Sequence, residues 1–282
     1  MSEYQYYEFL AVDRPLDEPQ QAEVRSLSTR AKITATSFVN EYHWGDFRGD
    51  PRRLMERYYD AHLYLANWGT RRVMLRLPRS LLAIEVAEDY CVGDQVSLWL
   101  AGESVVLDLA SEDDEGDVDD GPETTLAAIV GVRSELAAGD LRPLYLAWLA
   151  GYGYWEREEG AFDRDADDDL EPPVPPGLAS LTAPQRALAD FLRLDHDLLA
   201  VAAQASAPLR QSATDRRELA AWMAKLPSAE KDRLLLQVVD EHAPTVRMEI
   251  LHRFHENHAT PIPARPRRTV ATLLDGAAER RA

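Results

Sequence analysis

Strand-type sequence patterns occur only in the first 110 residues of this 282-residue chain. The clearest is "RVMLRLP" at 72–78, in which Val73, Leu75 and Leu77 would share one face of an extended chain and more polar residues the other. "QVSLWLAG" and "ESVVLDLA" follow as two runs that a turn at Ala101–Gly102 can join into a hairpin. Because hairpins join antiparallel strands, we predict an α+β fold with a mostly antiparallel sheet and helices.

The expected elements of this N-terminal half follow from residue type and periodicity. Asp17 is followed by Pro19 in the first turn of one expected helix, and Asp50 directly precedes Pro51 in another. An aspartate at this position accepts hydrogen bonds from free N–H groups of the first turn, so both residues are expected to be N-caps. We predict strands at 4–12, 32–44, 63–69, 72–78, 95–102 and 103–110, and helices at 16–28, 51–60 and 78–91.

Beyond residue 110 the apolar residues recur with helical periodicity, which predicts an α-helical bundle-like region. Within it, the acidic and proline-rich segment near 156–177 is expected to be an exposed insertion. The expected helices are 124–139, 142–155, 184–194, 196–205, 215–226, 228–242, 245–258 and 269–282. The predicted domains are 1–110 (α+β), 111–123 (acidic loop), 124–262 (helical) and 263–282 (basic linker and terminal helix).

The charge is negative and unevenly placed. The formal net charge is −18, and residues 111–173 hold 19 acidic but 4 basic residues. Phosphate backbones bind basic surfaces, so nucleic-acid binding by the whole chain is not favoured. The N-terminus does not resemble a secretion signal, Cys91 is the single cysteine, and no run of about 18 apolar residues could span a membrane. We expect a cytoplasmic protein without a membrane role.

The stretch "NEYHWGDFRGDP" (40–51) is dense in charged and aromatic residues. Glu41 and His43 are two residues apart on an expected strand and would share a face. A carboxylate beside an imidazole can exchange protons or, with Asp46, bind a metal. Glu41, His43 and Asp46 are therefore the catalytic candidates. The structural alternative is that Asp46, following Gly45, forms part of a turn.

A second group of candidates is basic and aromatic. Arginines and aromatic rings together can bind phosphate groups and stack on bases. The alternative is a solvated surface that carries helix ion pairs, since Arg52 and Glu56 are an i,i+4 pair of opposite charge. The candidates for a ligand or phosphate site are Arg48, Arg53, Arg57, Arg72, Arg76, Trp44 and Trp68.

The run "EILHRFHENH" (249–258) raises the question of a metal site. Glu249, His252 and His255 would lie near one face of a helix. A single helix cannot surround a metal, and a bundle site needs a second E-x-x-H pair, which we do not find. Surface histidines near a helix C-terminus explain the run equally well. We predict no metal and no cofactor.

Several of these blocks together resemble a family of uncharacterised bacterial proteins. The resemblance lies in "YQYYEFLAVDRPL", "STRAKITATSFVNEYHWGDFRGDP", "HLYLANWGTRRVMLRLP" and "DDDLEPPVPPGL". It covers most of the chain and implies that the two halves form one unit that ends in a charged helix. It implies no catalytic residues, because none is known for the family.

These observations favour a non-catalytic, cytoplasmic interaction or adaptor protein of a bacterial system. No complete catalytic constellation is present, and charge is segregated between an acidic middle and a basic tail, which suits electrostatic steering toward a protein partner. The alternative hypothesis is a nucleic-acid-associated or metal-dependent enzyme with a site around Glu41, His43 and the nearby arginines.

Overall fold

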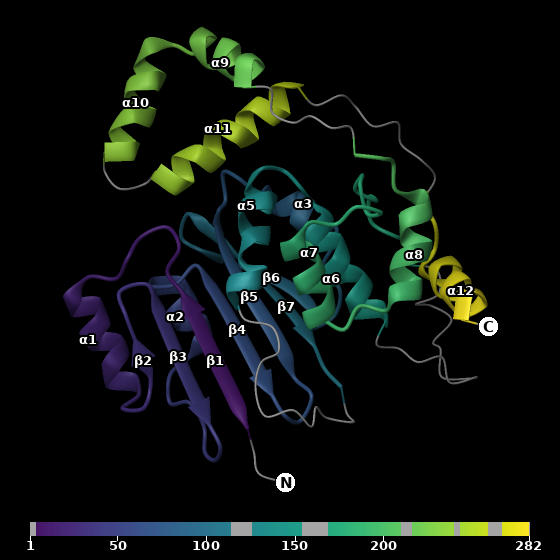
Figure 1. Cartoon of the computed structure of the whole chain (residues 1–282), viewed down its shortest axis with the longest axis horizontal. Coiled ribbons are helices and arrows are strands. Elements are labelled where there is room, and N and C mark those ends of the chain that lie inside the picture. Colours follow the sequence, from purple (N-terminus) through teal and green to yellow (C-terminus); the bar gives the residue numbers. More distant parts are fainter. Residues whose placement is uncertain are drawn as a thin grey trace.

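The computed structural model describes residues 4–113, 126–153, 169–209, 216–239, 243–258 and 267–281. A seven-stranded antiparallel sheet with the order β2-β3-β1-β4-β5-β7-β6 comes first and is followed by an all-helical region (Figure 1). The predicted α+β class is therefore confirmed. The strands are β1 (Gln5–Leu10), β2 (Lys32–Ile33), β3 (Ser37–Tyr42), β4 (Ala61–Ala66), β5 (Arg71–Pro78), β6 (Val96–Ala101) and β7 (Ser104–Ser111).

The helices fall into a set within the sheet half and a set after it. Between the strands lie α1 (Glu18–Leu27), α2 (Pro51–Arg57) and α3 (Ile84–Glu88). After the sheet come α4 (Leu126–Ile129), α5 (Gly131–Ala137), α6 (Arg142–Gly153), α7 (Ala183–Phe191), α8 (His196–Ala205), α9 (Arg216–Lys225), α10 (Ser228–Val239), α11 (Ala243–His258) and α12 (Val270–Arg281).

The sheet is covered on both faces. One face packs against α4 to α8 in a single hydrophobic core that continues from the strands into the helices. The other face forms a second core with α1, α2 and the ring of Phe47. Consecutive residues of β1 divide between the two cores, since Tyr6 belongs to the first and Tyr7 to the second. This explains why apolar residues occur on both faces of the first strand.

Alternation in β5 is as the sequence predicted. Val73, Leu75 and Leu77 are completely buried on the face that packs against α4 to α8. Met74 points to the second core. The hairpin between β6 and β7 also forms, with its two turn residues at Gly102 and Glu103 rather than at Ala101 and Gly102. Gly102 has a φ of +61°, a conformation that favours glycine in a two-residue hairpin turn.

Both predicted N-caps are confirmed. The Asp17 carboxylate accepts the N–H of Gln20 at 2.8 Å, and the Gln20 side chain accepts the N–H of Asp17, which completes a capping box. The Asp50 carboxylate accepts the N–H of Arg52 at 2.9 Å. Asp50, the last aspartate of the "NEYHWGDFRGDP" stretch, therefore has a structural role as the N-cap of α2.

Replacing Asp50 with alanine is expected to lower the free energy of unfolding by about 1 kcal/mol, because α2 loses its side-chain cap. Asp50→Asn keeps a capping oxygen and should cost less. Chemical denaturation of both variants measures the difference. Equal losses for the two variants would show that the charge of Asp50, and not the capping bond, is what matters.

Two of the predicted elements are divided in the structure. The segment 32–44 forms two strands because Thr34 closes a turn. Its hydroxyl accepts hydrogen bonds from the N–H groups of Thr36 and Ser37, and its own N–H donates to Ser37 O. A threonine that bonds to nearby backbone competes with the strand ladder. The expected helix at 124–139 is interrupted at Val130 into α4 and α5.

Two further expectations were wrong in extent. The helix expected at 78–91 is limited to α3, and the residues before it, Leu81 and Leu82, are buried in the first core. The insertion expected to be exposed near 156–177 is described from residue 169 onward, and there Glu171 and Pro172 are buried. Glu171 is buried because it forms an ion pair, which its acidic surroundings in the sequence do not reveal.

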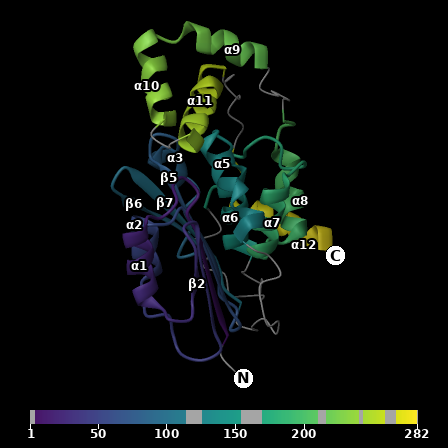
Figure 2. The same cartoon turned by 60° about the vertical axis from the view of Figure 1, so that its left-hand side comes forward.

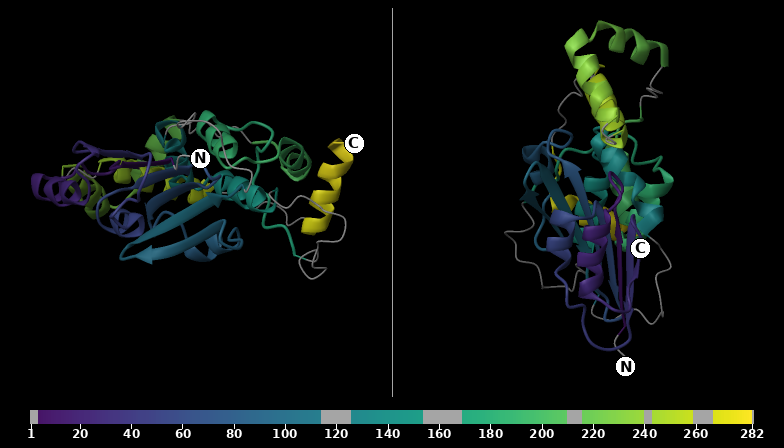
Figure 3. Two further views of the ribbon diagram at one scale, coloured as in Figure 1. Left: turned by 90° about the horizontal axis from the view of Figure 1, so that it is seen from below. Right: turned by 90° about the vertical axis from the view of Figure 1, so that its left-hand side faces the viewer.

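The last helices form two distinct groups. Helix α12 packs against α8 at one side of the molecule (Figure 1). Helices α9, α10 and α11 form a helical arm beyond one end of the sheet, where α11 contacts both α10 and α5 (Figure 2 and the right-hand view of Figure 3). No residue of α9 is buried, and in α10 only Leu234 is, within the described part of these helices. Helices α9 and α10 are therefore largely exposed.

Candidate functional site

The structure places Glu41 and His43 at the border of the sheet. Glu41 is exposed on β3 opposite Tyr6 of β1, and the ring of His43 lies 5.4 Å from that of Tyr4. Burial raises the pKa of Tyr6, and the charges of Glu8 and Glu41 add to the effect. Both residues thus lie beside Tyr4 and Tyr6 of the first strand segment.

Asp46 belongs to a different set of side chains. Its carboxylate accepts the Nε2–H of Gln5 at 3.0 Å. The amide oxygen of Gln5 in turn accepts the hydroxyls of Tyr7 and Tyr64 at 2.7 and 3.1 Å. Since Gln5 and Tyr7 alternate with Tyr6 along β1, this network lies on the opposite face from Tyr6. The three catalytic candidates are therefore not brought together, and Asp46 anchors a turn.

The candidate arginines are mostly neutralised by carboxylates. Arg57 lies 2.6 Å from Glu23, and Arg76 lies 2.7 Å from Asp60. Arg72 lies 3.2 Å from Asp108, where burial raises the pKa of the Asp108 carboxyl despite the nearby guanidinium groups. Arg48 and Arg53 are exposed, and so are the side chains of Trp44 and Trp68. An arginine already paired with a carboxylate is less available to a phosphate, so these contacts do not favour the nucleic-acid hypothesis.

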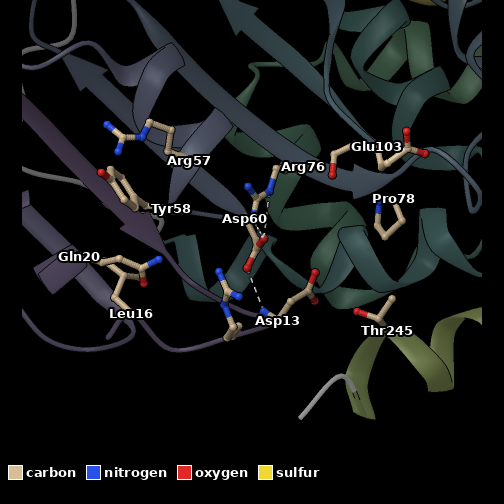
Figure 4. Close-up of a pocket in the computed structure, with 12 residues that line it drawn as sticks. Asp13, Leu16, Gln20, Arg57, Tyr58, Asp60, Arg76, Pro78, Glu103 and Thr245 are labelled. Atoms are coloured by element: carbon tan, nitrogen blue, oxygen red, sulfur yellow. Dashed lines mark hydrogen bonds and ion pairs between the residues drawn. The ribbon is translucent and has the colours of Figure 1, made fainter. Parts of the chain in front are cut away.

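Two of these arginines, Arg57 and Arg76, line one groove of about 410 Å³ (Figure 4). Asp60 lies between Arg76 and Asp13 in this view, and Thr245 of α11 lines the side opposite Arg57. The volume is within the range of small-molecule sites. The lining is mixed polar, charged and apolar: Asp13, Arg14, Leu16, Gln20, Arg57, Tyr58, Asp60, Arg76, Pro78, Glu103, Ser104 and Thr245.

The charges of the groove largely compensate each other. The buried Asp60 carboxylate accepts hydrogen bonds from Arg76 and from the N–H groups of Val12 and Asp13, at 2.7 to 3.2 Å. The buried Arg133 donates to both carboxylate oxygens of Asp13. Donors from the chain itself already occupy both oxygens of each of these two carboxylates. The contacts of the groove therefore hold distant segments of the fold together.

Sequence reasoning did not single out Asp13, Asp60 or Arg133. Asp60 and Arg76 are 16 residues apart, and Asp13 and Arg133 are 120 residues apart. Nothing in the local pattern around Asp13 or Arg133 indicates that they meet. A buried pair between distant segments leaves no periodic signal in the sequence.

The metal candidates lie in the arm. Glu249 is paired with Arg233 at 2.6 Å and lies 3.7 Å from Arg253. These arginines compete with any cation for the Glu249 carboxylate. The side chain of His255 lies outside the described residues, and among those that are described no three His, Cys, Asp or Glu side chains are grouped as metal ligands would be. The role of Glu249 that the structure shows is to join α11 to α10.

Helix α10 has an unusual division between its two faces. The face toward α11 carries the buried Leu234 and the partly exposed Glu230, whose carboxylate lies 2.7 Å from Arg253. The outward face carries Leu235, Leu236 and Val239, which are 64, 63 and 76 % exposed. A surface helix normally buries its apolar face and exposes its polar one. In α10, ion pairs attach the helix to its neighbour and an aliphatic stripe is left at the surface.

Comparison with known proteins identifies no relative: no family model, curated protein or solved structure matches the chain. None of the described helices combines the length and apolar character that crossing a bilayer requires.

Proposed function

We propose that this protein is a non-catalytic interaction protein that binds a partner protein through the outward face of α10. The observation that carries the proposal is the aliphatic stripe of Leu235, Leu236 and Val239, which are exposed on a helix whose inner face is held by ion pairs. Exposed aliphatic side chains that are contiguous on one helix face are typical of protein-binding surfaces.

The size of the stripe indicates what kind of element binds there. The three side chains, with the half-exposed Val238 beside them, occupy the last two turns of α10. A standard protein interface involves about 20–30 residues on each side. The stripe is much smaller, so it fits one face of a single amphipathic helix, which would insert aliphatic side chains at helical spacing. The partner predicted here is a protein that presents such a helix.

The proposal is tested by recovering the tagged protein from cells that naturally produce it. Wild-type protein is expected to retain one partner in near-stoichiometric amount, and the double variant Leu235→Asp, Leu236→Asp is expected to lose it. Both leucines are already exposed, so each change should alter the free energy of unfolding by no more than about 0.5 kcal/mol.

Val86→Asp is the matched control, because Val86 is an exposed aliphatic residue on α3, outside the arm. It should retain the partner. If the double variant is folded and retains the same partner as wild type, then α10 is not the binding surface. If Val86→Asp loses the partner to the same extent, the effect is a general response to added charge.

A further inference from the structure

Strand β6 is an unprotected edge of the sheet. It is the last strand in the order, and within the described part of the chain its outer side is bridged only at its first residue, by Val92 (Figure 2). At the opposite edge, β2 is two residues long and contains the exposed Lys32. Short strands and lysines are common devices that prevent a sheet edge from pairing with another chain. Strand β6, with the sequence VSLWLA, has neither a charged residue nor a proline.

The backbone of β6 offers hydrogen-bonding groups toward this open side. Val96 exchanges two hydrogen bonds of 3.0 Å with Val92, so the N–H and C=O of Val96 point away from β7. Every second residue of a strand points its backbone groups the same way. The N–H and C=O groups of Leu98 and Leu100 therefore also point outward, and within the described residues no backbone or side-chain partner occupies them.

Most side chains of β6 are only partly buried, and Leu100 is exposed where another strand would cover it. Leu100 is 52 % exposed, and Leu98 on the same face is partly buried against the first core. On the other face, the Trp99 ring lies 4.4 Å from the Arg52 guanidinium, and its Nε1–H donates to Glu56 at 3.0 Å. Because Arg52 and Glu56 already hold Trp99, little side-chain entropy is lost when a second strand packs against it.

We propose that β6 pairs with β6 of a second copy of this chain, antiparallel and with the twofold axis at Trp99. Leu98 of each copy then lies opposite Leu100 of the other. The two opposed pairs form four backbone hydrogen bonds, which use every outward N–H and C=O of Leu98 and Leu100 in both copies. The pairing stops before Val96, whose backbone is already bonded to Val92, and the strand of the other copy ends at Ala101, opposite Ser97.

The side chains match in the same register. Leu100 of each copy packs beside Leu98 of the other on one face, and the two Trp99 rings lie beside each other on the opposite face. No like charges oppose each other within the paired strands, because β6 itself carries none. This self-complementarity is the argument for a second copy rather than an unrelated strand.

The assembly closes at two copies. Pairing of β6 leaves β2 at both outer edges of the combined sheet, and β2 is short and contains Lys32. The interface is also separate from the stripe on α10, so the dimer does not depend on the proposed function.

Sedimentation velocity over a range of protein concentrations tests the proposal. Wild-type protein is expected to be a dimer that dissociates on dilution. Leu100→Lys introduces a lysine into the edge and should weaken dimerisation by about tenfold or more. The double variant Leu235→Asp, Leu236→Asp should dimerise as wild type does. A wild-type protein that is monomeric at all concentrations, or a dimer that the α10 variant abolishes and Leu100→Lys does not, would overturn the proposal.

Disulfide cross-linking tests the register of the strand pairing and does not depend on the Leu100→Lys variant. In a Cys91→Ser background, Trp99→Cys places two cysteines opposite each other at the twofold axis, with Cα atoms about 4.5 Å apart, which a disulfide can bridge. Ser97→Cys is the matched control, because its two copies would be roughly 14 Å apart along the strands. Oxidation should link the Trp99→Cys protein into dimers and leave Ser97→Cys unlinked. Equal linkage of both, or of neither, contradicts the register proposed here.

Discussion

Replacing Glu171 with alanine is expected to lower the free energy of unfolding by about 3–5 kcal/mol, the cost of breaking a buried ion pair. The Glu171 side chain is 2 % exposed and accepts two hydrogen bonds of 2.8 Å from Arg268, as well as one from the buried hydroxyl of Tyr145. Its loss leaves both Arg268 and Tyr145 without their shared acceptor. Urea or guanidinium denaturation measures the change.

The same contact determines where the C-terminal helix lies. The N–H of Glu171 donates to Arg268 O, and the N–H of Val270 donates to Asp169 O, so the segment before α12 pairs with the segment before Pro172. Arg280→Ala is the matched control, because Arg280 on α12 forms an exposed ion pair with Asp197 that should contribute less than about 1 kcal/mol. If Glu171→Ala costs no more than Arg280→Ala, the buried pair does not anchor α12.

The second large expected effect is a loss of stability in acid caused by His62. Its imidazole is buried on β4, stacks on Phe9 at 3.9 Å, and lies with Nδ1 2.9 Å from Glu8 O. Burial, opposed by the hydrogen bond to Glu8 O and assisted by the charge of Arg72, lowers the pKa of His62 to about 3. In the unfolded chain the histidine titrates near its ordinary pKa of about 6.5.

The direction in which stability changes with pH follows from the pKa values of His62 in the folded and unfolded chain. Below pH 6.5 the unfolded chain binds a proton that the folded protein does not accept until about pH 3, so stability falls as the pH falls through this window. The slope from one such group approaches about 1.4 kcal/mol per pH unit.

His62→Asn removes the titration, and the asparagine amide can still donate to Glu8 O. Denaturation midpoints of wild type and variant at pH 7 and pH 4.5 separate His62 from the other acidic groups, because those titrate in both proteins. The variant is expected to be less stable at pH 7 but to lose less on acidification. Parallel losses in the two proteins would show that His62 is not held neutral in the folded state.

The fold class and several local features could be predicted because their causes are local. Alternation in 72–78 and the caps at Asp17 and Asp50 each depend on residues within a few positions of one another. Elements were misplaced where a short-range competitor was overlooked, as with the Thr34 turn that divides 32–44.

The candidate site was harder to predict because its contacts join distant residues. Arg57, Arg72 and Arg76 look alike in the sequence as unpaired positive charges, yet each meets a carboxylate from another element. The aliphatic stripe of α10 was visible as periodicity, but periodicity alone does not tell which face of a helix is buried. The ion pairs to Arg253 and Arg233 decide this, and they depend on how α10 and α11 pack.

Amine-specific cross-linking in cells that produce the protein tests the central claim, partner binding by α10, most directly. The chain contains three lysines, of which Lys225 and Lys231 lie in the arm and Lys32 lies on β2. We predict that one partner protein is cross-linked through Lys225 or Lys231, and that these cross-links disappear in the variant Leu235→Asp, Leu236→Asp while any at Lys32 persist. A partner cross-linked mainly through Lys32, or arm cross-links that are unchanged in the folded variant, would contradict binding through α10.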